Sequence, residues 1–163
     1  MDFLELLKRL HANDVEFVVV GGYASMLLGS DMLTQDLDIC IRLGQENQGK
    51  LFDAIEDLGP RHRMQPSALA LTRETATSCT IQNLYLETSL GILDCLGGIT
   101  GLGEYKEVLP LSRPLDLGGF KVRSLWFDGL IRAKEALGRE KDKQAVLKLK
   151  AIQENLAEQG GGR

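Results

Sequence analysis

The stretch Asp36-Leu37-Asp38-Ile39-Cys40-Ile41 decides how this chain is interpreted, together with the pair Gly21-Gly22 that stands thirteen residues before it. Apolar residues dominate the stretch and predict a β-strand, in which Asp36 and Asp38 project from one face while Leu37, Ile39 and Ile41 face the core. Two carboxylates about 7 Å apart along a strand can converge on one or two divalent cations, because these ions take oxygen ligands. The pattern therefore predicts a site for phosphate chemistry, although the wet face of an edge strand would look the same.

The glycine pair lies between two predicted elements. Residues 16–20 form a β-branched run that is too short for a helix and predicts a buried strand, and residues 23–28 predict a short helix. A strand that ends in two glycines before a helix exposes backbone N–H groups at the positive helix end, with no Cβ to block a phosphate. Gly21 and Gly22 are thus candidate phosphate contacts, and an ordinary tight strand-to-helix turn is the alternative interpretation.

A third carboxylate occurs in the apolar run Gly91-Ile92-Leu93-Asp94-Cys95-Leu96. A lone aspartate within such a strand is costly unless it is paired, hydrogen-bonded or metal-bound. Alternation places Ile92, Asp94 and Leu96 on one face, so we expect Asp94 near a sheet end or a cleft. Three carboxylates on adjacent strands would suit Mg²⁺, which leaves coordination positions open for substrate phosphates, whereas a structural hydrogen-bond acceptor is the alternative role.

The C-terminal part of the chain is predicted to be helical and basic. Residues 127–137 and 141–157 have helical patterns, and residues 132–150 contain seven Lys/Arg against three Asp/Glu. Residues 1–60 carry the opposite balance, with eleven Asp/Glu against four Lys/Arg. An acidic half that holds metal and a basic half that holds phosphate would form a plausible pair, although helical Lys and Glu also simply solvate a surface. Lys134 borders the apolar stripe of its helix, so its ammonium group either reaches solvent or enters a cleft.

Together these residues resemble the nucleotidyltransferase superfamily related to DNA polymerase β. The superfamily pattern places a hydrophobic residue before Gly-Gly or Gly-Ser and, after a spacer, Asp-hydrophobic-Asp/Glu-hydrophobic. Val20-Gly21-Gly22 and Asp36-Leu37-Asp38-Ile39 match this pattern, and Asp94 resembles the third carboxylate of the family. The segment from Leu130 to Asp142 is similar to the "LI-x-x-K … R-x-K-D" ending of small bacterial members, among them the abortive-infection-type toxins.

The resemblance implies a fold and a reaction. The fold is α/β (α+β), a mixed β-sheet packed by helices and followed by C-terminal helices. The reaction is transfer of a nucleoside monophosphate from an NTP to an acceptor hydroxyl on RNA, protein or a small molecule, with release of pyrophosphate and with two Mg²⁺ ions, or Mn²⁺, as cofactors. The implied catalytic and metal-binding residues are Asp36, Asp38 and Asp94. The implied nucleotide-binding residues are Gly21, Gly22, Lys134, Arg139 and Lys141.

Met32 departs from the family pattern, because many relatives carry an arginine at this position. The departure removes a candidate triphosphate contact, which Arg42 or the region of Lys134 would have to replace. It also keeps an alternative function open. In that alternative the chain is a catalytically weakened nucleotide-binding or protein-interaction module, for example one half of a toxin–antitoxin pair.

The composition is that of an ordinary globular domain. The 163 residues are 44% hydrophobic and 26% charged, so we expect a single globular domain over residues 1–158 and a flexible tail over residues 159–163. The resemblance implies that this domain is nucleotidyltransferase-like. No apolar run approaches the roughly 20 residues that span a bilayer. The N-terminus lacks the basic region of a signal peptide, and the three cysteines have no metal-type spacing. These features predict a cytoplasmic protein without a membrane partner, and the small size leaves room for a partner chain or a second copy to complete the cleft.

Overall fold

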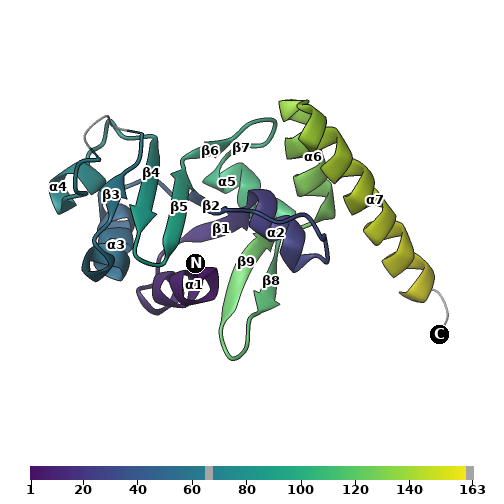
Figure 1. Ribbon diagram of the computed structural model, residues 1–163, viewed down its shortest axis with the longest axis horizontal. Coiled ribbons are helices and arrows are strands. Elements are labelled where there is room, and N and C mark those ends of the chain that lie inside the picture. The colour runs from purple at the N-terminus through teal and green to yellow at the C-terminus, as the bar shows by residue number, and fades with distance from the viewer. Residues whose placement is uncertain (65–67, 161–163) are drawn as a thin grey trace.

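The computed structural model describes residues 1–64 and 68–160 and is built on one mixed sheet (Figure 1). Seven strands pair in the order β3-β4-β5-β2-β1-β9-β8. Their bounds are β1 (Phe17–Val20), β2 (Asp36–Ile41), β3 (Arg61–His62), β4 (Asn83–Thr88), β5 (Gly91–Leu96), β8 (Ser112–Asp116) and β9 (Lys121–Leu125). The pairs β2–β5 and β1–β9 are parallel and the other four are antiparallel, and helices pack around the sheet, which confirms the α/β fold with a mixed sheet.

Strand β2 lies in the middle of the sheet, and its register decides where the acidic side chains meet. It runs antiparallel to β1, with Asp38 opposite Val20, and parallel to β5, with Asp38 opposite Asp94. Side chains at equivalent positions of paired strands project from the same face of a sheet. The pairing therefore carries Asp36, Asp38 and Asp94 to one place, while Leu37 and its apolar neighbours on β2 are buried.

Helices pack around the sheet. Figure 1 shows α3 and α4 beside β3 at one end of the sheet, and α6 and α7 on the opposite side of the molecule. The helices are α1 (Phe3–Ala12), α2 (Gly21–Leu27), α3 (Gln45–Ile55), α4 (Arg73–Ala76), α5 (Tyr105–Val108), α6 (Phe127–Leu137) and α7 (Glu140–Gly160), with 3-10 turns η1 (Glu56–Leu58) and η2 (Leu109–Leu111). A small second sheet joins β6 (Gly98–Ile99) to β7 (Gly103–Glu104). Within the part of the chain described, no helix has the length and apolarity needed to cross a bilayer.

The apolar periodicity of α1 explains why it folds against the sheet. Leu6, Leu7 and Leu10 recur at helical spacing and are fully buried. The carboxylate of Asp2 caps the helix by accepting the backbone N–H of Glu5 at 2.9 Å. The helix therefore contributes its leucine face to the core and leaves its polar face in water.

The turn between α6 and α7 positions the basic residues of the C-terminal region. Helix α6 stops at Gly138, whose left-handed φ of 65° is easily adopted by glycine, and the N–H of Gly138 donates to the carbonyl of Lys134 at 3.1 Å. Helix α7 restarts at Glu140 and packs along α6. The turn thereby brings Arg139 and Lys141 close to Lys134.

Strand β8 and the two-residue strands β3, β6 and β7 were not expected from the sequence. Residues Ser112–Asp116 form β8, which pairs with β9 and lies at the sheet edge. Pro114 obscures this strand in the sequence, since proline cannot donate to a ladder and is tolerated mainly at edges. The carboxylate of Asp116 accepts the N–H groups of Gly118 and Gly119, at 2.9 and 3.0 Å, and so closes the hairpin.

Several predicted boundaries also need correction. Helix α2 includes both glycines and begins at Gly21 rather than at residue 23. The predicted tail over residues 159–163 begins inside α7, because that helix runs to Gly160, and residues 161–163 lie outside the described part. Residues 61–80 show only a weak sequence pattern, typical of a short helix and a loop, and contain β3 as well as the short α4.

Candidate active site

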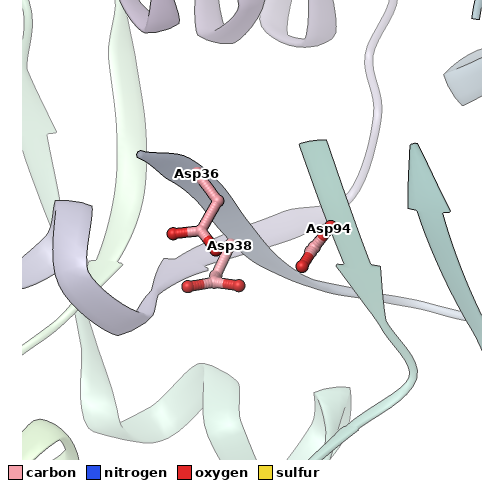
Figure 2. Close-up of side chains that lie close together, drawn as sticks. All are labelled: Asp36, Asp38 and Asp94. Carbon is pink, nitrogen blue, oxygen red and sulfur yellow. The ribbon is translucent and has the colours of Figure 1, made fainter. Parts of the chain in front are cut away.

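Three carboxylates converge on one side of the central strands. Asp36 and Asp38 come from β2 and Asp94 from β5, and Figure 2 shows the three side chains next to one another. One carboxylate oxygen from each lies within 4.8 Å of the others. Strand pairing alone creates this arrangement, since Asp38 and Asp94 are opposite each other in the register. We refer to Asp36, Asp38 and Asp94 as the carboxylate cluster.

The negative charge of the cluster is only partly compensated by the protein. Burial, followed by the charges of Asp36 and Asp94, raises the pKa of Asp38 to about 7, although Lys134 and Arg63 act in the opposite direction. Burial also raises the pKa of Asp94, in spite of its ion pair with Arg63. A carboxyl group with a raised pKa is one whose charged form lacks a sufficient positive partner. The cluster is therefore electrostatically suited to receive a cation.

The glycine pair allows a close approach between α2 and the acidic strand. A Cβ on Gly21 would lie 2.2 Å from Oδ2 of Asp38, and a Cβ on Gly22 would lie 2.7 Å from Oγ1 of Thr34. Gly21 also has a left-handed φ of 65°. Thr34 in turn donates its hydroxyl to Oδ1 of Asp36 at 2.8 Å. The side chains of Asp38 and Thr34 thus occupy the space that a Cβ would fill at this turn. Packing alone therefore explains why both positions are glycine, whether or not they also contact phosphate.

A cavity of about 520 Å³ opens over the carboxylate cluster, a size typical of small-molecule sites. Its opposite wall comes from α6 and α7 and carries Lys134, Arg139, Lys141 and Asp142. Arg139 donates to both oxygens of Asp142, at 2.6 and 3.3 Å, and these hydrogen bonds lower the pKa of the buried Asp142 carboxyl. Burial lowers the pKa of Lys134, while Asp142 and Asp38 favour its charged form. The cavity therefore has an acidic wall on the sheet and a basic wall on the helices.

All eight site residues expected from the sequence line this single cavity. They are Gly21, Gly22, Asp36, Asp38, Asp94, Lys134, Arg139 and Lys141. Met32, the residue at the position of the family arginine, also lines it. Arg42 does not replace that arginine, because it pairs with Glu16, with Nη2 2.5 Å from Oε2, and does not line the cavity. Lys134 lines the same cavity as Met32.

Sequence reasoning missed Arg63 as a neighbour of the cluster. Its guanidinium forms an ion pair with both oxygens of Asp94, with Nε 3.2 Å from Oδ1, and lies 5.6 Å from the centre of the Tyr85 ring. No motif marks this arginine, because it follows a strand of only two residues in a weakly patterned region. Asp142 belongs to the quoted C-terminal motif, but its role as the partner of Arg139 depends on the turn at Gly138.

The donor set of the carboxylate cluster fits a hard divalent cation. All three side chains offer oxygen, which Mg²⁺ and Mn²⁺ prefer over nitrogen and sulfur. A doubly charged ion would also offset the burial and the carboxylate repulsion that together raise the pKa of Asp38. Two of the three ligand side chains are only partly buried, so the position is accessible from the cavity.

The fold is that of known nucleotidyltransferase structures. A proposed nucleotidyltransferase from Thermotoga maritima matches with a TM-score of 0.57 and 15% identity, over 90% of this chain and 91% of its own. An antigenic nucleotidyltransferase-like protein from Paracoccidioides brasiliensis matches with a TM-score of 0.55 and 15% identity, over 90% of this chain and 73% of its own. ANT(2″)-Ia, in complex with adenylyl-2″-tobramycin, matches with a TM-score of 0.51 and 17% identity, over 91% of this chain and 95% of its own.

No protein-family model matches the chain, and no curated protein matches its sequence. At identities of 15 to 17% the structural likeness establishes the fold. Fold and site together define a protein with the nucleotidyltransferase fold, in which the carboxylate cluster lies in a cavity of a size typical of small-molecule sites.

Proposed function

We propose that this protein is a divalent-metal-dependent nucleotidyltransferase, which moves a nucleoside monophosphate from an NTP to an acceptor hydroxyl and releases pyrophosphate. The observation that carries the proposal is the convergence of Asp36, Asp38 and Asp94 within 4.8 Å, in a cavity whose opposite wall carries Lys134. The shared fold with nucleotidyltransferases supports it. A cluster of three carboxylates on a basic-walled cavity is a poor site for an anionic ligand alone and a good one for a metal–phosphate complex.

The residues of the two walls would have different tasks. Asp36 and Asp38 would hold two Mg²⁺ ions, or Mn²⁺, and Asp94 would hold the ion near the acceptor and accept the proton of its hydroxyl. Such ions stabilise the attacking and leaving oxygens of an in-line displacement. Lys134, Arg139 and Lys141 would neutralise the β- and γ-phosphates from the helical wall, and Gly21 and Gly22 would border them. Catalysis of this kind rests on positioning and electrostatics, which side chains fixed on the inner strands β2 and β5 would supply.

The acceptor is an alcohol in this proposal. One structural neighbour, ANT(2″)-Ia, holds an adenylylated small molecule, so a small-molecule hydroxyl is the first acceptor to test, beside RNA and protein hydroxyls. The alternative of a weakened binding module has less support. It rested on Met32, but the carboxylate set is complete and Lys134 lies in the same cavity as Met32.

Label transfer tests the proposal. The protein is incubated with Mg²⁺, each α-labelled NTP in turn and either cell extract or tobramycin, and the products are separated by size. We expect wild type to transfer label and Asp36→Asn to lose transfer, while Asp57→Asn, which alters an exposed ion pair with Arg9, retains it. Equal labelling by wild type and Asp36→Asn, or no labelling with any NTP, would contradict the proposal.

A further inference from the structure

Arg63 is the cation that the protein itself supplies to the carboxylate cluster. Its guanidinium approaches Asp94 as a fork, Nε toward Oδ1 and Nη2 toward Oδ2, so both carboxylate oxygens are engaged. Asp94 is the buried member of the pair, because its side chain is 7% exposed, whereas the Arg63 side chain is 29% exposed and reaches solvent. Water therefore screens part of the interaction from the arginine side.

The position of Arg63 is fixed by its own strand environment. Its backbone N–H donates to the carbonyl of Tyr85 at 3.0 Å, and its guanidinium lies 5.6 Å from the centre of the Tyr85 ring. Tyr85 is opposite Asp94 in the antiparallel register of β4 and β5. Three interactions thus hold Arg63 beside the neighbouring residues Tyr85 and Asp94: the backbone hydrogen bond, the contact of the guanidinium with the ring and the ion pair.

We propose that Arg63 is a built-in counter-cation that lowers the affinity of the carboxylate cluster for free divalent cations by holding both oxygens of Asp94. The inference rests on the proposed function, in that it assumes the cluster binds a cation. Asp94 becomes a full ligand only when the guanidinium turns away, and even a displaced guanidinium repels an ion bound nearby. A cation that arrives with an NTP brings phosphate ligands and depends less on Asp94, so Arg63 would favour the metal–nucleotide complex over the bare ion.

The chain offers a matched control for Arg63. Arg73 also pairs with an aspartate, Asp53, and lies 5.4 Å from the centre of an aromatic ring, that of Phe52. This pair lies outside the cavity lining and is about half exposed. Arg73→Gln therefore removes a similar set of interactions without touching the carboxylate cluster.

Binding of Mn²⁺ alone, without nucleotide, tests the inference by calorimetry or by the loss of the free-ion paramagnetic resonance signal. We expect Arg63→Gln to bind Mn²⁺ roughly tenfold more tightly than wild type, because a positive charge beside the ion is removed. Arg63→Lys keeps the charge and should stay within about twofold to threefold of wild type, as should Arg73→Gln. The double variant Arg63→Gln, Asp94→Asn should not show the tighter Mn²⁺ binding expected for Arg63→Gln alone.

The outcomes separate the inference from the proposed function. Mn²⁺ binding by wild type that is unchanged or weakened in Arg63→Gln overturns the role of Arg63 and leaves the metal site standing. The absence of Mn²⁺ binding in wild type and in Arg63→Gln, with both folded by circular dichroism, overturns both. If Arg63→Gln is unfolded, Mn²⁺ binding by Arg63→Lys is used instead. Weaker Mn²⁺ binding by Arg63→Lys than by wild type would mean that the two-pronged contact of Arg63 with Asp94 supports metal binding, which would overturn the inference.

Discussion

Asp38 and Asp142 line one cavity from opposite walls, and the charges next to them are of opposite sign. Asp38 stands on the sheet among like charges, and its pKa is raised to about 7. Asp142 stands on α7 with Arg139 as its hydrogen-bonding partner, and its pKa is lowered. The comparison shows two ways to build a charged wall. The sheet collects carboxylates through strand register and compensates them only in part, by the ion pair of Arg63 with Asp94, whereas on the helical side Arg139 and Asp142 pair with each other.

The difference indicates which wall awaits a ligand. The helical wall pairs Arg139 with Asp142 and also presents Lys134 and Lys141 to the cavity. On the sheet, burial and repulsion among the carboxylates cost folding free energy, part of which a bound cation would recover. Substitutions on the two walls should therefore have different effects on activity, stability and binding.

The largest effect is expected for activity at the acidic wall. Asp38→Asn should lower the rate of nucleotidyl transfer by about 1000-fold, since loss of one group that stabilises transition-state charge costs about 10² to 10³ in rate and Asp38 is central to the cluster. The rate is measured by label transfer or pyrophosphate release. A rate within tenfold of wild type would remove Asp38 from the catalytic machinery.

The same substitution on the two walls should change stability in opposite directions. Without metal, the pKa of Asp38 is about 7 in the folded protein and about 4 in the unfolded chain. The folded protein therefore loses stability as the pH rises from about 4 to about 7, because the unfolded chain releases the proton more easily. Asp38→Asn should remove that loss and stabilise the metal-free protein at pH 8 by a few kcal/mol, on the order of the pKa shift.

Asp142 should behave in the reverse manner. Its lowered pKa contributes stability above the unfolded value, which is lost as pH falls through the folded pKa. Asp142→Asn should therefore destabilise the protein at pH 8 by about 1 to 3 kcal/mol, because Arg139 loses a charged acceptor. Urea unfolding in EDTA measures both variants, and shifts of the same sign would show that the two walls do not differ as described.

The third test concerns the turn that supports the acidic wall. Gly21→Ala places a Cβ at 2.2 Å from Oδ2 of Asp38 and imposes a left-handed φ on alanine. Gly59→Ala has nearly the same φ, 60° against 65°, with no atom within 4 Å of the added Cβ. We expect a loss of about 1 kcal/mol for Gly59→Ala and about 3 kcal/mol for Gly21→Ala, since strain and overpacking add. Mn²⁺ binding should weaken only in Gly21→Ala. Equal losses with intact Mn²⁺ binding would show that the contact with Asp38 is unimportant.

The smallest effect is expected on the basic wall. Lys134→Met keeps the apolar stem and removes the charge that faces Asp38, and should weaken NTP binding about tenfold. Arg132→Met, on the same helix but outside the cavity lining, serves as the control and should change the affinity by less than about twofold. Equal affinities for the two variants in a fluorescent-nucleotide titration would contradict the role of Lys134.

Strand geometry explains why the acidic wall was predictable. The two-residue period of β2 puts Asp36 and Asp38 on one face whatever surrounds them, and an aspartate in an apolar strand such as β5 signals a special environment. For the basic wall, the sequence predicted a helix and the position of Lys134 beside the apolar stripe of that helix. These are local patterns, which depend on neighbouring residues along the chain.

Long-range contacts account for what could not be predicted. Arg63 reaches Asp94 across 31 positions of sequence, through a strand of two residues that no periodicity can reveal. The φ of Gly21 and its approach to Asp38 depend on how α2 packs over β2. Edge strand β8 was hidden by Pro114, because a proline in a polar segment is more typical of a loop.

A crystal structure with Mn²⁺ and a nonhydrolysable NTP analogue tests the central claim most directly. The account predicts an anomalous Mn²⁺ peak at about 2.2 Å from carboxylate oxygens of Asp36 and Asp38, with the phosphates lying toward Lys134. A nucleotide bound elsewhere on the protein, or a cavity in which the carboxylate cluster binds no Mn²⁺, would contradict it.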